Sequence, residues 1–307
     1  VLNPVKRRRI TDVFETGVKV IDSLLTVGEG QRLGIFAGSG VGKSTLLGMI
    51  ARNSSADVNV IALIGERGRE VRDFVDECLG DGLKKSVVVV ATSDEPALVR
   101  VHAALAATAI TEYFRSQGLS VSFLMDSITR FAMAQREVGL AVGEPPTARG
   151  YTPSVFSALP QLLERSGPGL VDEGNATAFY TVLVEGDDMM EPVADHVRAI
   201  LDGHIVLSRD LNQQGQYPPV DVLQSTSRLA HQLMQQDEQR LIDECVSLMA
   251  LYKKSQDMID FGAYKEGVNE KLDKAVRVMP QLEVFFRQAP EQGLSLIHIS
   301  EPTRPSQ

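Results

Sequence analysis

The chain carries at residues 32–45 the stretch Arg-Leu-Gly-Ile-Phe-Ala-Gly-Ser-Gly-Val-Gly-Lys-Ser-Thr, in which an apolar run leads into a glycine-rich loop. The apolar run is typical of a buried strand, and Lys-Ser-Thr is typical of the start of a helix. Such a loop can curl so that successive N–H groups point inward, toward an anion. We therefore expect a polyphosphate site here. Its predicted residues are Gly38, Ser39, Gly40, Val41, Gly42, Lys43, Ser44 and Thr45.

Three residues at the end of the loop have separate predicted roles. Lys43 is placed to reach the β- and γ-phosphates, the Ser44 hydroxyl to hold Mg²⁺, and Thr45 to begin the helix beside the α-phosphate. The pattern G-x-x-x-x-G-K-[S/T] has glycine in its first slot, where this chain has Ala37. A methyl group is tolerated there if φ stays negative. The alternative is a glycine-rich turn that only joins a strand to a helix.

Composition places the chain among globular proteins. It has 307 residues, of which 43% are hydrophobic, and 40 acidic against 31 basic residues give a formal charge of -9. This balance argues against a broad electrostatic contact with nucleic acid. We interpret the one basic run, residues 6–9, as a solvated connector. Cys78 and Cys245 are far apart and fit neither a disulfide framework nor a zinc site, which favours a reducing cytoplasm.

Apolar runs alternate with helical patterns up to about residue 228. The predicted strands are 32–37, 58–64, 86–91, 121–125, 178–184 and 204–207, and the predicted helices are 43–52, 69–79, 96–116, 127–138, 154–165 and 192–201. This alternation predicts an α/β fold with a mainly parallel sheet flanked by helices. Strand signals are absent from 229–287, so we expect a small all-α C-terminal domain. A long loop is predicted at 139–153, and such loops are usually functional or disordered.

Two carboxylates follow predicted strands, where ligands of open α/β sheets bind. Glu66 follows the run 61–65, and Asp126 ends the run 121–125. An aspartate at this point can hold Mg²⁺ through water, and a glutamate on a neighbouring strand can orient water for hydrolysis. The alternatives are that Asp126 caps a helix and that Glu66 is a surface acid capping the helix near Arg69. Glu70 is expected to support the site or to act as a first-turn helix charge.

Several stretches resemble the catalytic subunits of rotary ATP synthases and their relatives. They are 37–45, 65–70, 126–131 and the run Tyr-Pro-Pro-Val-Asp-Val-Leu-Gln-Ser-Thr-Ser-Arg at 217–228. Within that group, 144–156, 162–165 and 180–188 are similar to the export ATPases of flagellar and injectisome type III secretion systems. The stretch 83–94 favours the flagellar branch. The resemblance implies a P-loop, RecA-like nucleotide-binding fold that uses ATP and Mg²⁺.

The resemblance also implies roles for individual residues. Glu66 matches the water-activating glutamate, Asp126 the metal-side aspartate, and Tyr217 the aromatic ring that stacks on adenine. Arg228 matches an arginine finger that acts on the nucleotide of the adjacent subunit. A local ion pair with Asp221 or another acid is the alternative for Arg228. For Arg67 two roles stay open, which are contact with the γ-phosphate and support of Glu66.

The predicted function is Mg²⁺-dependent ATP hydrolysis by a homohexamer that energises protein export. Expected partners are stalk proteins, stator or regulator proteins and chaperone–cargo complexes, with no nucleic acid, and the expected location is cytoplasmic and peripheral at the inner membrane. A nucleic-acid translocase and a non-catalytic nucleotide-binding subunit are the alternatives. Stimulation of the ATPase by single-stranded RNA would favour the translocase. Non-catalytic subunits lack the water-orienting carboxylate, whereas Glu66 is present here, and hydrolysis that survives Glu66→Gln would contradict the predicted mechanism.

The predicted domain boundaries follow from these patterns. We expect residues 1–17 to be a connector left from a missing N-terminal β-barrel domain, 18–228 the ATPase domain, and 229–293 the helical domain. Residues 294–307 break the helical periodicity and resemble a cloning remnant. Without the β-barrel, the chain is expected to be largely monomeric and weakly active.

Overall fold

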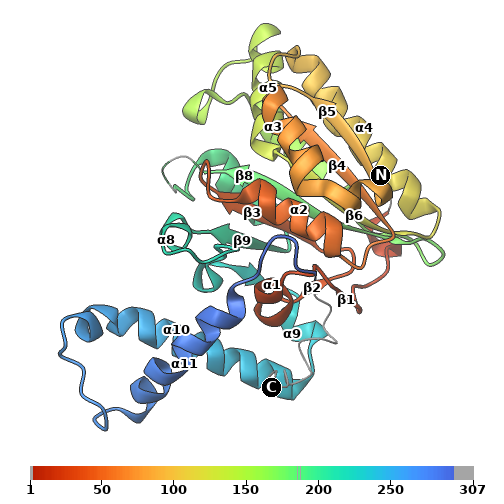
Figure 1. Ribbon diagram of the computed structural model, residues 1–307. Coiled ribbons are helices and arrows are strands. Elements are labelled where there is room, and N and C mark those ends of the chain that lie inside the picture. Colours follow the sequence, from red (N-terminus) through yellow and green to blue (C-terminus); the bar gives the residue numbers. More distant parts are fainter. Residues whose placement is uncertain (1–2, 185, 187, 294–307) are drawn as a thin grey trace.

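An eight-stranded, mainly parallel sheet forms the centre of the fold, in a computed structural model that describes residues 3–184, 186 and 188–293 (Figure 1). Its order is β10-β9-β3-β8-β6-β4-β5, with β7 paired to β8. The strands are β3 Arg32–Ala37, β4 Val58–Ile64, β5 Ser86–Ala91, β6 Ser120–Asp126, β7 Gly167–Pro168, β8 Asn175–Leu183, β9 Gly203–Leu207 and β10 Thr226–Ser227. Only β7 and β10 pair antiparallel within the described part of this sheet.

Helices cover both faces of the sheet, as its continuous apolar strands require. One apolar core lies between the sheet and α4 Ala97–Ser116, α5 Ile128–Ala141, α6 Pro153–Leu163 and α7 Pro192–Ile200. The other lies beneath α1 Lys19–Leu24, α2 Lys43–Asn53 and a turn of π-helix at Phe74–Leu79, which continues α3 Gly68–Asp73. The predicted α/β class with a mainly parallel sheet is therefore confirmed.

Most element predictions agree with the structure to within a few residues, and two of them need correction. The helix predicted over 69–79 is α3 followed by the π-helical turn, so its second half is wound differently. The loop predicted over 139–153 is shorter, because α5 continues to Ala141. The remaining connection contains a 3₁₀ turn at Ala148–Gly150 before α6 begins at Pro153.

The N-terminal segment is tied to the sheet body. Arg7 donates hydrogen bonds to the carbonyl oxygens of Ser166 (2.6 Å) and Glu164 (2.7 Å), and Arg8 donates to Glu173 O (2.6 Å). The interpretation of this basic run as a solvated connector therefore does not hold for Arg7, which is partly buried, whereas Arg8 stays exposed. Further along, β1 Val13–Phe14 pairs with β2 Val27–Gly28, and the Phe14 side chain is buried in the core.

The C-terminal part of the described chain is helical. It comprises α9 Ala230–Leu233, α10 Gln236–Asp260 and α11 Glu270–Phe286, with α10 and α11 packed as a hairpin that projects from the sheet body (Figure 1). A short helix, α8 Arg209–Gln213, precedes this region in the chain. The predicted remnant at 294–307 lies outside the described residues. Among the described residues, no helix combines the length and apolar character needed to cross a membrane.

Candidate nucleotide site

The glycine-rich loop joins the end of β3 to the start of α2. Gly40 (φ 76°) and Gly42 (φ 98°) adopt left-handed backbone conformations, and Gly42 is the residue before the first turn of α2. A Cβ on Gly40 would meet nothing within 4 Å, and one on Gly42 would come no nearer than 3.8 Å to Pro219. The space beside the loop is thus open, and the backbone conformation is what requires glycine. Ala37 ends the strand and has no positive φ, so its methyl group is accommodated.

The structure brings Lys43, Glu66 and Asp126 together. Lys43 Nζ lies 2.5 Å from Asp126 Oδ1 and 3.6 Å from Glu66 Oε1. Asp126 ends β6, Glu66 follows the end of β4, and Lys43 begins α2 after the loop that follows β3. The ends of these strands meet at one edge of the sheet because the strands are parallel. All three are largely buried, with exposed fractions of 12%, 13% and 4%. The two carboxylates therefore flank one ammonium group in a site with little solvent.

Burial controls the charge states in this cluster. Burial and the nearby Asp126 carboxylate raise the pKa of Glu66 to about 7, against the opposing effect of Lys43. For Lys43, burial favours the neutral amine, but the attraction of Asp126 and Glu66 is stronger and raises its pKa. Glu66 Oε1 has no hydrogen-bond partner among the described residues. A buried carboxylate oxygen without a partner, with a pKa near neutrality, suits a group that accepts a proton from water.

Thr181 also belongs to this cluster, although sequence reasoning missed it. Its hydroxyl donates a 2.8 Å hydrogen bond to Asp126 Oδ1 from the middle of β8, the strand beside β6. A threonine inside a strand gives no sequence signal of its own. Thr181 thus helps to fix the carboxylate that Lys43 contacts.

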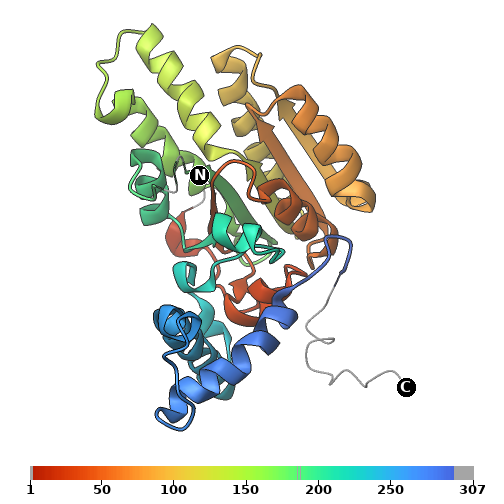
Figure 2. The ribbon, with the colours of Figure 1, turned by 60° about the vertical axis from the view of Figure 1, so that its left-hand side comes forward.

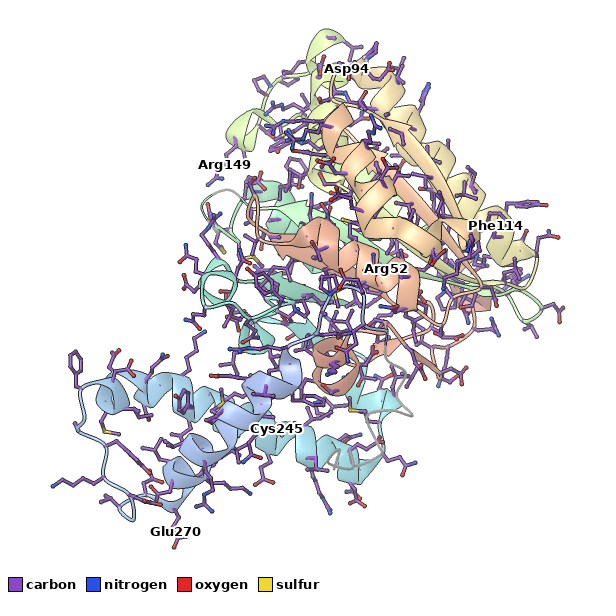
Figure 3. All side chains as sticks on the ribbon, in the orientation of Figure 1. Arg52, Asp94, Phe114, Arg149, Cys245 and Glu270 are labelled. Atoms are coloured by element: carbon purple, nitrogen blue, oxygen red, sulfur yellow. The ribbon has the colours of Figure 1, made fainter. Side chains whose placement is uncertain are left out.

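A cavity of about 870 Å³ opens over the cluster. The phosphate-binding loop, Glu66 and Glu70 line it, together with arginines that the sequence analysis did not select. These are Arg130, Arg136, Arg149 and Arg209. Figure 3 shows Arg149 at the end of the sheet where the loop lies. The cavity is therefore rich in cations, as a site for a polyphosphate should be.

These four arginines reach the cavity from three elements, since Arg130 and Arg136 both lie on α5, Arg149 in the 3₁₀ turn and Arg209 at the start of α8. Arg130 lies in the first turn of α5, and its Nε is buried without a hydrogen-bond partner among the described residues. The Arg136 guanidinium lies 5.2 Å from the centre of the Tyr151 ring, and Arg149 Nη2 lies 2.7 Å from Asp188 Oδ2. Only Arg130 had a signal, because it stands one helical turn after Asp126 in a stretch already noted. The other three arginines gave no such signal, because their meeting depends on how α5, the 3₁₀ turn and α8 are arranged in the fold.

Arg67 lines the same cavity, but its side chain is mostly exposed. Its Nη1 lies 3.2 Å from Glu70 Oε1. Hydrogen bonding between Glu70 and Glu66 contributes to the raised pKa of Glu66. Arg67 therefore reaches Glu66 through Glu70, and both predicted roles of Arg67 stay open.

Arg228 lies away from the cavity. It follows β10, whose residues pair with Gly203 and His204 at the start of β9, whereas the phosphate loop follows the end of β3. Its side chain is exposed and donates to Arg198 O at 3.3 Å. The alternative that Arg228 pairs with Asp221 is wrong, because the partners of that carboxylate are Lys253 (3.3 Å) and the Gln224 amide (2.8 Å).

A second cavity, of about 550 Å³, adjoins the first at Gly42 and Thr45, which line both. Its lining is mainly apolar and includes Leu46, Met49, Tyr217, Pro218 and Pro219, with 287–290 on one side. Half of the Tyr217 surface is exposed. An apolar cavity with an exposed ring, directly beside the loop that is suited to phosphates, has the character of a site for a flat aromatic group.

The residues at the loop also fit Mg²⁺ in the way that phosphate-binding enzymes hold it. Ser44 lines the first cavity and directly follows Lys43 in the chain. The buried Asp126 carboxylate contacts the Lys43 ammonium group. Among the described residues, no group of three His, Cys, Asp or Glu side chains is arranged to hold a metal alone. Magnesium commonly takes only one or two protein ligands and completes its shell with phosphate and water. A hydroxyl and a carboxylate are therefore sufficient here.

Comparisons with known proteins agree with this geometry. The family model "ATP synthase alpha/beta family, nucleotide-binding domain" matches residues 17–227, and "T3SS EscN ATPase C-terminal domain" matches 234–299. The flagellum-specific ATP synthase of Bacillus subtilis (strain 168) is 58% identical over 291 residues, which is 94% of this chain and 66% of that protein. The chain thus spans slightly less than two thirds of this relative.

Two solved structures of a type III secretion ATPase share the fold. The assembled ATPase EscN from enteropathogenic E. coli superposes with a TM-score of 0.92 at 49% identity, over 96% of this chain and 71% of that chain. EscN in complex with its central stalk EscO gives a TM-score of 0.89 at the same 49% identity, over 96% of this chain and 70% of that chain.

Proposed function

The chain belongs to the ATP synthase alpha/beta family, and from that premise we propose that it is the ATPase part of a ring-forming motor that energises type III protein export. The observation that carries the proposal is the convergence of Lys43, Glu66 and Asp126 at the glycine-rich loop. The relatives named above belong to flagellar and injectisome systems, and the higher identity to a flagellar protein favours the flagellar branch.

The residues of the cluster divide the chemistry of ATP hydrolysis. Backbone N–H groups of 38–45 and the Lys43 ammonium bind the triphosphate, while Tyr217 stacks on the adenine. Ser44 directly, and Asp126 through water, would hold Mg²⁺, which when bound neutralises charge on the phosphate oxygens. Glu66 orients the attacking water and accepts its proton at Oε1, which is buried and has no hydrogen-bond partner among the described residues.

A single copy would be incomplete as an enzyme. Arg228 stands at the opposite end of the strands from Lys43, so it cannot serve the cavity of its own chain. A guanidinium supplied by a neighbouring copy would stabilise charge on the transferring phosphoryl group and raise the rate by a factor on the order of 10³ to 10⁵. This arrangement requires a head-to-tail assembly, and a homohexamer fits the assembled state named for EscN.

The remaining partners follow from the proposed export role. EscN was solved with a central stalk, which supports a stalk protein as a partner of this chain. Stator or regulator proteins and chaperone–cargo complexes complete the proposed set, with the ring attached peripherally at the cytoplasmic side of the inner membrane. The acidic balance of the chain disfavours a nucleic-acid track.

Mixing two inactive variants tests the shared site. Glu66→Gln removes the water-orienting acid and Arg228→Ala removes the guanidinium, so each variant alone should hydrolyse little ATP at any concentration. A 1:1 mixture at high concentration should recover up to about a quarter of the wild-type rate, since half of the sites keep Glu66 and half of those face an intact Arg228.

The control is Arg240→Ala, which removes an exposed arginine from α10 and should leave the rate unchanged. No recovery in the mixture, under conditions where the wild-type chain is active, would show that the two residues do not meet across an interface. Stimulation of the wild-type rate by single-stranded RNA would instead favour a nucleic-acid translocase.

A further inference from the structure

The segment at residues 287–292, here called the wall segment, forms one side of the apolar cavity. It follows the last turn of α11, and its residues 287–290 line the cavity together with Tyr217. Figure 2 shows the chain after α11 passing beside the lower end of α2. The wall segment belongs to the C-terminal part of the chain, whereas the rest of the cavity comes from the sheet body. The shape of the cavity therefore depends on contacts that hold the wall segment against the sheet body.

Gln288 joins the wall segment to the sheet body. Its side chain is 3% exposed. Its Nε2 donates to Gly17 O (2.8 Å) and Gln292 O (2.7 Å), and its Oε1 accepts from Lys19 N (2.8 Å). Its backbone N–H donates to Tyr217 O at 2.9 Å. Both carboxamide N–H groups are engaged by the chain itself, so neither is available to read the edge of a base.

The turn that receives Gln288 is itself fixed. The buried Asp22 carboxylate accepts hydrogen bonds from Thr16 N (2.9 Å), Thr16 Oγ1 (2.6 Å) and Gly17 N (2.9 Å). Gly17 has a positive φ of 72°, and a Cβ there would come within 2.3 Å of Asn53 Cβ at the end of α2. The turn is therefore set against the same helix whose first residues line the phosphate cavity.

Arg52 provides a second, independent connection. It lies in the last turn of α2, and its Nη2 donates a 2.5 Å hydrogen bond to Pro290 O in the wall segment. Figure 3 labels Arg52 near this end of the helix. The wall segment is thus held to α2 by Arg52 and to the 16–19 turn by Gln288.

We propose that Gln288, supported by Arg52, is a positioning residue for the nucleobase, because it holds the wall segment opposite Tyr217 and so sets the width of the base cavity. The inference rests on the proposed nucleotide site. It states that binding of the base depends on the hydrogen bonds of Gln288, which lie outside the space that the base would occupy. It also predicts that the cavity holds purine bases by shape, with little dependence of Gln288 on which purine is bound.

Binding measurements with three ligands separate this role from others. Gln288→Met keeps the volume and removes the hydrogen bonds of the side chain, and Arg52→Met loosens the wall segment without changing Gln288. For each variant, the Kd values of ATP and GTP should rise by about tenfold, the effect of losing one to two hydrogen bonds. The Kd of tripolyphosphate, which has no base, should stay within about twofold of the wild-type value.

The matched control is Gln281→Met on α11, an exposed residue whose side chain makes, within the described part of the chain, a single 3.4 Å hydrogen bond to Arg277 O. Its three Kd values should equal those of the wild type. Arg52→Met also keeps the test valid if Gln288→Met does not fold, as judged by circular dichroism.

Three results would overturn the inference. They are unchanged ATP affinity in both variants, equal weakening of ATP and tripolyphosphate, and weakening of ATP without GTP, which would indicate direct reading of the base. If the wild-type chain bound neither ATP nor tripolyphosphate, the proposed function itself would fail, and that outcome is distinct from the other three.

Discussion

At the scale of single residues, the role proposed for Glu66 is accompanied by a cost to stability. Its folded-state pKa of about 7 stands above the ordinary value of 4.5, because burial and Asp126 disfavour the charged form. The folded state therefore loses stability relative to the unfolded state as the pH rises from 4.5 through 7. Such a cost is common where activity needs a buried ionisable group.

Glu66→Gln should accordingly stabilise the protein, and more so at alkaline pH. Glutamine is neutral at every pH, so the gain in the free energy of unfolding should be larger at pH 8 than at pH 6 by about 1 kcal/mol. Urea denaturation of both proteins at the two pH values measures it.

Glu70→Gln is the control for this measurement. Burial opposes the charge of Glu70, but hydrogen bonding with Glu66 and Arg67 and the nearby positive charges together outweigh burial and lower the pKa of Glu70, so its replacement should bring no such gain. An equal gain for Glu66→Gln at pH 6 and pH 8 would contradict the assigned pKa.

At the scale of elements, α2 is held in place by close packing against the π-helical turn. A Cβ on Gly48 would lie 2.5 Å from Cys78 O and 2.9 Å from Cys78 Cβ, and a backbone carbonyl cannot move aside cheaply. Because α2 begins at Lys43, a displacement of this helix would also move the phosphate-binding loop.

Gly48→Ala should therefore destabilise the fold by about 1–3 kcal/mol, although alanine is the better helix former. Thermal or urea unfolding measures the change. Gly68→Ala is the matched control, since a Cβ at this first residue of α3 meets nothing within 4 Å. A Gly48→Ala variant as stable as the wild type would mean that the two elements are not packed this closely.

The elements also show how far sequence patterns reach. The strand ends that carry Lys43, Glu66 and Asp126 were predictable, because buried parallel strands read as continuous apolar runs that stop at a polar residue. The π-helical turn was not, since apolar positions within only six residues do not separate 3.6 residues per turn from a wider winding. Arg149, in a 3₁₀ turn, and Arg209, at the first residue of α8, were missed because only the tertiary fold brings these two elements to one cavity.

At the scale of the whole molecule, the main feature is the separation of Arg228 from the cavity of its own chain. The rate of ATP hydrolysis per subunit should therefore rise with protein concentration, as copies associate and complete each other's sites. A dilution series of Mg-ATPase activity, with light scattering on the same samples, measures this dependence. The mass should increase where the rate does.

Arg228→Ala should remain inactive across that series while binding ATP with wild-type affinity, because its side chain lies outside both cavities of its own chain. A wild-type rate per subunit that is high and independent of dilution would exclude a contribution from a neighbouring copy.

Arg228 follows β10 and lies beside the start of β9, whereas Lys43 lies after the end of β3, so each copy has a polarity along its strands. In a symmetric pair, like surfaces face each other, so two Arg228 surfaces or two nucleotide cavities would meet. Neither copy would then receive the arginine of the other, and both would be inactive. In an open head-to-tail filament, the cavity of one terminal copy would always lack an arginine from a neighbour. Only a closed ring, in which every copy supplies Arg228 to one neighbour and receives it from the other, would complete every site.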